Sequence, residues 1–279
     1  MHGVLDSPAA WVANGNVFSL ACRAYQHKFD VWLGTYRGNR DGMDNASPDE
    51  SRPNHWQFCV TDHALDCSAV VQQVHDVKAT EEPLRRHALY HATAPKPPSV
   101  ASTDAVWSDG EVDADGAPAL EPVTVVGVGH SMGGAALLLH VMTCGALGFD
   151  HGLCRMVLLS PAGYHKEMPP LVRALSTALA WTLAPMGDGP FPLTSSRLQR
   201  AAANLYQDLK RTRATADIVS AVCSMFFGGR HDDCVLRHIN FQDYTIGLTS
   251  RRVIQHGVQC SLAHQFQPFD YGADENFAR

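Results

Sequence analysis

The amino-acid sequence predicts an α/β fold in which helices cover a parallel sheet, because short apolar runs alternate with longer helical patterns. Three runs have the length and the Val, Leu or aromatic content of buried strands: Phe29–Leu33, Val123–Val128 and Met156–Leu159. Each run is followed directly by a glycine or a serine. Strands that are apolar along their whole length are typical of parallel sheets with both faces covered. Helix-sized connections between such strands favour right-handed β-α-β units.

Helical patterns fill the connections between these runs. Val12–Gln26 is expected to hold a helix after Asn16, and Asp62–Asp76 presents its apolar residues on one helical face. Another helix is expected over Gly133–Leu147, directly after the second strand. Beyond Tyr164 the strand pattern stops, and prolines and glycines separate three further helical patterns: Leu171–Ala184, Ser195–Arg211 and Ala216–Phe227.

Two segments divide the chain. Residues 80–122 are rich in Pro, Ala, Asp and Gly and have few large apolar residues. They are therefore expected to form a solvated, acidic insertion loop without chemistry of its own. Residues 164–249, in which helical patterns follow one another, are expected to form a helical cap over the sheet. The expected core spans residues 1–163, with the insertion loop at about 80–122.

Composition and charge argue against several classes of protein. Hydrophobic residues make up 45% and charged residues 18% of the 279 residues, which is ordinary for a globular protein with a sizeable core. The net charge of −6 provides no basic field for phosphates, so no nucleic acid partner is expected. The 15 histidines are scattered, without an HExxH motif or paired CxxC motifs, and no metal site is expected.

Cysteine usage and the apolar runs bear on the compartment. The eight cysteines form no tight framework and are expected to be mostly reduced, buried thiols; Cys223 and Cys234, which flank a Gly-Gly turn, are the alternative pair if the protein is secreted. No signal peptide follows Met1. The longest helical apolar run, Leu171–Ala184, is too short to span a bilayer and carries Arg173, so no transmembrane segment is expected. These patterns leave the localisation undetermined.

The sequence GHSMG, from Gly129 to Gly133, fits the G-x-S-x-G pattern of a nucleophile elbow, with an apolar strand before it and a helix after it. Such a turn holds the serine in a strained backbone conformation, so that Ser131 Oγ is expected to project above the sheet. Both glycines are needed because a side chain there would strike the neighbouring helix or strand. The N–H of Met132 is expected to donate to an oxyanion. The alternative is a glycine-rich turn with a passive serine.

A second oxyanion donor is expected from an earlier loop that follows a strand. The chain opens with His2-Gly3-Val4, an HG-type sequence of this kind. Gly3 permits close approach of the backbone, and the N–H of Val4 is the candidate donor. The alternative is a disordered terminus, since only Met1 precedes the motif.

Several further segments accompany the GHSMGG motif in a fixed order. They are HGVLDSPAAWVANG, FDVWLGTYRGNR (Phe29–Arg40), HWQFCVTDHALD (His55–Asp66), TSRRVIQHGVQ (Thr249–Gln259) and FQPFDYGADEN (Phe266–Asn276). Together these segments resemble the acid lipase family, the gastric and lysosomal lipase type of α/β-hydrolase. The resemblance covers nearly the whole chain apart from the insertion at 80–122.

This resemblance implies an α/β-hydrolase fold with a helical cap, and it makes residues 250–279 the segment that returns from the cap to the core. It implies hydrolysis of long-chain acyl esters, such as triacylglycerols or sterol esters, by a Ser–Asp–His triad without a cofactor. By position Ser131 is the nucleophile, Val4 and Met132 supply the oxyanion N–H groups, and Arg37 is structural rather than catalytic. A secreted or a lysosome-like or vacuole-like location is implied as well.

The acid and the base of the implied triad are not found in the chain. In this fold the triad follows the order Ser, Asp, His, and in acid lipases the last two come after a segment that resembles Phe269–Gly272. The chain ends at Arg279. We therefore expect a lipase truncated at both ends, with no triad Asp or His. Seven histidines follow Ser131: His140, His151, His165, His231, His238, His256 and His264. One of them would have to act as a substitute base, and the alternative is that each is a surface or packing residue.

The sequence therefore predicts a serine ester hydrolase that forms an acyl-enzyme on Ser131. Four apolar residues of the cap, Leu171, Leu175, Leu179 and Trp181, are expected to line an acyl pocket or to meet lipid surfaces, with packing between cap and sheet as the alternative. The rival function is that of a non-catalytic lipid- or partner-binding remnant of the fold. Acyl transfer to an acceptor other than water would use the same serine.

Overall fold

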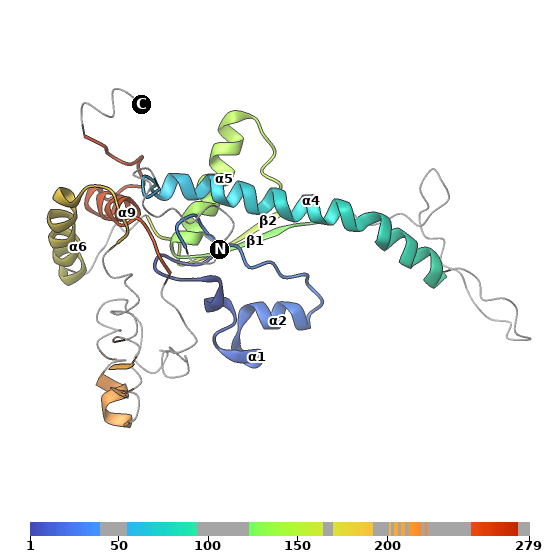
Figure 1. Cartoon of the computed structure of the whole chain (residues 1–279), viewed down its shortest axis with the longest axis horizontal. Coiled ribbons are helices and arrows are strands. Elements are labelled where there is room, and N and C mark those ends of the chain that lie inside the picture. The colour runs from blue at the N-terminus through green and yellow to red at the C-terminus, as the bar shows by residue number, and fades with distance from the viewer. Residues whose placement is uncertain are drawn as a thin grey trace, which may run out of the picture.

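The computed structural model describes residues 1–39, 55–93, 123–163, 170–191 and 247–272, together with short stretches between 201 and 221 (Figure 1). Strands β1 (Val126–His130) and β2 (Arg155–Leu159) form a parallel pair in which Val126 lies opposite Arg155 and His130 opposite Leu159. Helix α5 (Met132–Leu147) connects them. Two of the three predicted strands and the helix between them are therefore present as a β-α-β unit.

The structure contradicts the strand predicted at Phe29–Leu33. Residues 29–33 form no regular element and join no ladder among the described residues, and the Phe29 side chain is 60% exposed. Besides β2, the described residue that bonds the backbone of β1 is Met1. Its nitrogen donates to Val128 O (2.6 Å), and its carbonyl accepts from His130 N (3.1 Å). Both backbone groups of Met1 therefore bond β1, and residues 29–33 do not pair with β1 at this position.

The two strands are also less buried than the sequence predicts. Side chains on β2 alternate between exposed and half-buried, and Val126 of β1 and Val157 of β2 are 41% and 43% exposed. Such alternation shows that one face of the pair packs on the core while the other is reached by solvent. The expectation of a sheet buried on both faces is therefore not met at these strands.

Helix α4 (Val60–Thr93) is the longest element and projects far beyond the sheet in Figure 1. It confirms the helix predicted over Asp62–Asp76, but it continues through residues 80–93, which were expected to belong to the insertion loop. The reason is composition, because this stretch is rich in Glu, Arg, Leu and Ala, which favour helix. The rest of the expected loop, 94–122, lies outside the described residues.

The core lies where α5 packs against α4 on one side and against β1 on another. The small residues Ala135 and Ala136 of α5 are almost fully buried, which allows the two helices to approach closely. The buried cluster also contains residues of the helices and of the loops around them. The helical ones are Cys67 and Val71 of α4, Leu137 of α5 and Val253 of α9, and the loop residues are Tyr36, Trp56, Phe58 and Leu153.

Short helices precede residues 29–33. They are η1 (Pro8–Trp11), α1 (Gly15–Phe18) and α2 (Leu20–Gln26). The helix predicted within Val12–Gln26 is thus present, but it is interrupted at Ser19, which has an extended backbone (φ −76°, ψ 130°).

At the other end of the molecule, α6 (Pro170–Leu183) and η2 (Ala184–Met186) pack on α9 (Arg251–Ala263). Ser250 caps α9 by accepting from Val253 N (3.2 Å), and its hydroxyl donates to Phe58 O (2.5 Å), which joins α9 to the start of α4. The helix predicted at Leu171–Ala184 is confirmed. Those at Ser195–Arg211 and Ala216–Phe227 lie largely outside the described residues, although 213–218 are helical.

Within the part of the chain that the structure describes, no helix combines the length and the apolar character needed to cross a membrane.

Candidate active site

Ser131 occupies the sharp turn between β1 and α5. Its backbone has φ 52° and ψ −119°, a conformation that costs a non-glycine residue free energy and that persists only where surrounding contacts enforce it. Its side chain is half-buried and does not cap α5. The predicted elbow geometry is therefore present, and the hydroxyl is not committed to the helix end.

Backbone hydrogen bonds enforce this strained turn. Ser131 N donates to Leu159 O at the end of β2 (2.9 Å), and Ser131 O accepts from Ala162 N (2.9 Å) as well as from the first turn of α5. These contacts tie the serine to the last residue of β2 and to the loop that follows β2. The backbone of Ser131 is thus held by main-chain hydrogen bonds.

The glycines of the motif allow backbones to meet. A Cβ added at Gly129 would lie 2.5 Å from Gly133 O, and a Cβ at Gly133 would lie 2.4 Å from Met1 O and 2.6 Å from His2 O. Real Cβ atoms do not approach backbone so closely. The expected reason for both glycines is therefore confirmed, and at Gly133 the approaching backbone is that of residues 1 and 2.

One candidate oxyanion donor, Met132, directly follows the serine, and the loop that carries the other, Val4, passes close to it. Met132 is the first residue of α5 and is 5% exposed, so no earlier helical carbonyl is available to its N–H. A Cβ at Gly3 would lie 3.2 Å from His130 Nδ1 and 3.3 Å from Ser131 Cβ. The loop that carries Val4 therefore lies against the elbow, while the donor role of Val4 stays a prediction.

Four histidines after Ser131 lie among the described residues, and each has a structural partner; His151 Nδ1 accepts from Leu153 N (3.2 Å). His140 bridges Ser68 Oγ (Nδ1, 2.8 Å) and His151 O (Nε2, 2.9 Å), and it thereby joins α5 to α4. His256 Nε2 bonds Gln267 O (2.7 Å), and His264, at the end of α9, bonds Arg173. His165, His231 and His238 lie outside the described residues, as do residues 273–279.

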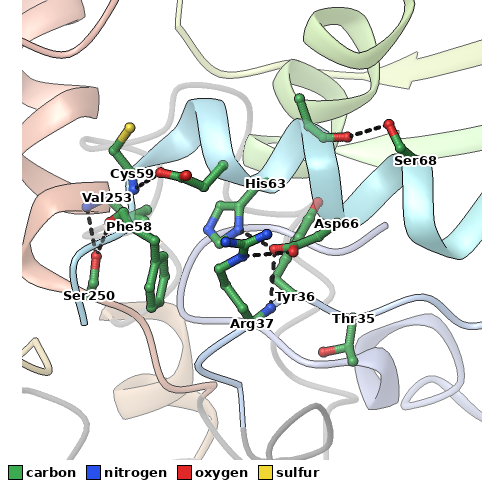
Figure 2. Close-up of polar contacts among 12 residues, drawn as sticks. Thr35, Tyr36, Arg37, Phe58, Cys59, His63, Asp66, Ser68, Ser250 and Val253 are labelled. Atoms are coloured by element: carbon green, nitrogen blue, oxygen red, sulfur yellow. Dashed lines mark hydrogen bonds and ion pairs between the residues drawn. The ribbon is translucent and has the colours of Figure 1, made fainter. Parts of the chain in front are cut away.

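One histidine–carboxylate pair was not predicted from the sequence. His63 Nδ1 lies 3.0 Å from Asp66 Oδ2 on the first turns of α4, and Figure 2 shows Arg37 directed at the same carboxylate. Arg37 Nε donates to Asp66 Oδ1 (2.7 Å). The spacing of the two residues indicates the pair, because positions three apart share one helical face. The triad order Ser, Asp, His directs attention to residues after Ser131 instead.

Burial and hydrogen bonding set the charges in this cluster. Burial lowers the pKa of His63, although Asp66 opposes this shift. Burial raises the pKa of Asp66, but hydrogen bonds from His63 and Arg37 outweigh it, and the pKa lies below its usual value. At neutral pH a neutral His63 therefore donates from Nδ1 to a charged Asp66. Its Nε2 is buried and has no hydrogen-bond partner.

His2, next to the elbow, is also held neutral. Its ring contacts Gly3 O through Nδ1 (2.9 Å) and Thr35 Oγ1 through Nε2 (3.2 Å), and the side chain is 2% exposed. Burial lowers the pKa of His2 to about 4.

A buried thiol nearby is no nucleophile at neutral pH, because burial raises the pKa of Cys67 to about 12.

The four predicted acyl-contacting residues lie on α6, which is separated from the elbow in Figure 1. Leu171, Leu175 and Trp181 are 44%, 49% and 79% exposed, and Leu179 is half-buried. An open hollow of about 590 Å³ borders Arg173, Thr177 and Trp181 on the same helix. Their role in substrate binding stays a prediction.

Within the described ranges, no three His, Cys, Asp or Glu side chains are grouped so that they could hold a metal ion. The described cysteines are free, and Cys59, Cys67 and Cys260 are buried as expected, whereas Cys154 is exposed. Cys223 and Cys234 lie outside the described residues.

Comparison with known proteins gives one distant relative. No protein-family model matches the chain. Over 284 aligned residues the chain is 24% identical to Lipase 1 of Drosophila melanogaster, and the alignment covers 99% of this chain and 51% of the fly protein. The chain thus spans about half the length of the curated relative that it matches. It is distantly similar to a lipase, and its helices and parallel strand pair are compatible with an α/β fold.

Proposed function

We propose that this chain carries the nucleophile of a serine ester hydrolase of the acid-lipase type, with an α/β-hydrolase core (1–163), a cap (164–249) and a return segment (250–279). One observation supports this proposal above all. A serine with φ 52° stands between a parallel strand and a helix, in a turn whose glycines admit the backbone of residues 1 and 2. The distant similarity to a lipase points to the same chemistry.

In the proposed reaction Ser131 Oγ attacks the acyl carbonyl carbon while a base takes the hydroxyl proton. The carbonyl oxygen becomes an oxyanion that accepts from the N–H groups of Met132 and Val4. Collapse of this intermediate expels the alcohol, which takes up the proton, and leaves the acyl group on Ser131. Water then releases the fatty acid by the same steps. The family resemblance places the acid and base of the triad after Gly272.

The proposed substrates are esters of long-chain acyl groups. The exposed apolar side chains of α6, Leu171, Leu175 and Trp181, supply a surface that an acyl chain or a lipid layer would cover. Covering them would remove apolar area from water, at about 25 cal/mol per Å².

A second candidate function is lipid or partner binding without catalysis. It is favoured by the four described histidines after Ser131, because each of them is engaged in a structural hydrogen bond: His140, His151, His256 and His264. On this alternative Ser131 keeps its geometry but lacks an activating base.

Hydrolysis of p-nitrophenyl esters of increasing acyl length tests the proposal. The wild-type protein, with the acid and base of the triad present, is expected to hydrolyse the long-chain esters, and Ser131→Ala is expected to abolish turnover above the background rate. Ser160→Ala is the matched control, because Ser160 follows β2, has φ 45° and is exposed. Turnover that survives in Ser131→Ala would contradict the proposal. A folded wild-type chain that binds fatty acid without turnover would favour the second candidate.

A further inference from the structure

The loop from His2 to Asp6, called here the donor loop, needs external support. It contains Leu5 with φ 59°, a left-handed conformation that disfavours a bulky side chain. Its only internal backbone hydrogen bond among the described residues is the long contact from Asp6 N to Gly3 O (3.3 Å). Contacts with other segments therefore decide where the N–H of Val4 lies relative to Ser131.

One short segment supplies most of these contacts. Thr35 Oγ1 lies 3.2 Å from His2 Nε2, and the Tyr36 hydroxyl donates to His2 O (3.3 Å). Asn39 Nδ2 donates to Asp6 O (2.8 Å). The segment Thr35–Asn39, called here the clamp, thus holds the donor loop at both of its ends. Tyr36 and Asn39 are each 2% exposed, so water does not compete for these bonds.

Gly247 adds a further contact to the donor loop, next to Asn39. Gly247 N donates to Leu5 O (3.0 Å), and a Cβ at Gly247 would lie 1.8 Å from Asp6 O. The backbone of the donor loop is therefore in direct contact with both the clamp and Gly247.

The clamp is itself anchored on α4. Asp66 accepts from Arg37 N (3.2 Å) and from Arg37 Nε (2.7 Å), so one carboxylate fixes both the main chain and the side chain of the clamp. Figure 2 shows Tyr36 and Arg37 lying beside Asp66 and His63. A Cβ at Gly38, which has φ 77°, would lie 2.5 Å from Phe58 Cζ, so the clamp also packs tightly on the segment before α4.

We propose that Tyr36, Asn39 and Asp66 are positioning residues that set the donor loop, and with it the second oxyanion donor, against Ser131. This inference rests on the proposed function, because only there does Val4 act as a donor. These residues do not touch the substrate. They act through the backbone of residues 2–6, so their loss is expected to lower the rate of acylation without changing the affinity for an apolar ligand.

Two variants test this inference in the full chain. Tyr36→Phe removes one hydroxyl and keeps the ring against His63, while Asn39→Ala removes the bond to Asp6 O. The amides of Asp6 and Gly247 donate to the donor loop, so their hydrogen exchange reports its opening. Exchange at both amides is expected to be about fivefold to tenfold faster in either variant.

Capture of Ser131 by a long-chain fluorophosphonate gives the second readout. In both variants the limiting capture rate is expected to fall about tenfold, with an unchanged apparent binding constant. Asp66→Asn is expected to act in the same direction. Asp188→Asn, which alters a similar Arg–Asp pair on α9, is the matched control and is expected to leave both readouts unchanged.

The two hypotheses fail differently. If the wild-type chain is not captured at all, the proposed function fails, and the amide exchange alone decides whether the clamp positions the donor loop. If exchange at Asp6 and Gly247 is the same in Asn39→Ala and Tyr36→Phe as in the wild-type chain, the positioning role is overturned, whatever the capture rate.

Discussion

The elbow and the α6–α9 end of the molecule are built in opposite ways. At the elbow, backbone contacts backbone: Ser131 is tied to Leu159 and Ala162, and Gly133 lies against residues 1 and 2. At α6, apolar side chains face outward, and Trp181 is 79% exposed. The backbone of the candidate nucleophile is thus held by main-chain contacts, so a substitution that disturbs them is expected to be costly. The exposed side chains of α6 are expected to tolerate substitution.

Polar side chains hold the second region together. Arg252 pairs with Asp188 (2.5 Å), and Gln255 Nε2 donates to Leu183 O (3.1 Å). Such contacts near the surface contribute little stability and weaken with salt. The two regions should therefore respond very differently to mutation, pH and ionic strength.

The largest effect is expected from a methyl group at the elbow. Gly133→Ala places a Cβ against the backbone of residues 1 and 2 and should cost about 3 kcal/mol or more in free energy of unfolding. Gly145→Ala in the same helix meets nothing within 4 Å and should stabilise the protein by up to about 1 kcal/mol. Urea unfolding of both variants measures the difference. Equal stabilities would refute the backbone contact at Gly133.

Acid is expected to have the next largest effect, through His2. Its pKa is about 4 in the folded protein and about 6.5 when unfolded, so below pH 6.5 the unfolded state binds the proton first. Stability is therefore present above pH 6.5 and falls as the pH approaches 4, by about 2 to 3 kcal/mol from this residue.

Urea unfolding at several pH values checks this expectation. His63, whose pKa burial also lowers, adds to the loss in the same direction. In His2→Gln the decline between pH 6.5 and 4 should be visibly shallower. A decline of the same steepness in His2→Gln would mean that His2 is not held neutral by burial.

A smaller effect is expected at the α6–α9 end. Asp188→Asn breaks the ion pair with Arg252, whose partners are partly exposed, and should cost at most about 1 kcal/mol in free energy of unfolding. The cost should shrink further at high salt, because ions screen exposed charges. Urea midpoints at low and high ionic strength measure it. A large cost that is independent of salt would place this pair among the buried contacts instead.

The smallest effect on stability is expected from the exposed face of α6. Trp181→Ala should change the free energy of unfolding by no more than about 0.5 kcal/mol, because most of the ring already lies in water. If α6 meets lipid, the same variant should bind less to phosphatidylcholine vesicles in a sedimentation assay. Leu183→Ala is the contrasting variant, since Leu183 is 2% exposed and its truncation should cost about 2 kcal/mol or more.

The sequence predicts local features of this fold well. The β1–α5 turn was found because a strand, two glycines and a helix follow one another within a single stretch. The strand at Phe29–Leu33 was wrong because pairing depends on a neighbour that local composition does not reveal. Helix α4 was expected to end early because the proline-rich stretch after it masked the helix-forming residues of 80–93.

Non-local contacts explain what the sequence could not predict at the site. Asn39 and Asp6 are far apart in sequence, as are Arg37 and Asp66, and no motif links either pair. Their meeting depends on the packing of α4 beside the donor loop. The assignment of Ser131, Met132 and Val4 to catalysis stays a prediction, although the elbow geometry at Ser131 agrees with it.

The site of covalent capture by a fluorophosphonate tests the central claim most directly. After a brief reaction of the folded chain, peptide mapping by mass spectrometry identifies the modified residue. We expect a single modification at Ser131 in the wild-type chain, no modification in Ser131→Ala and full modification in Ser160→Ala. Modification at any other serine, or a folded chain that stays unmodified, would contradict it.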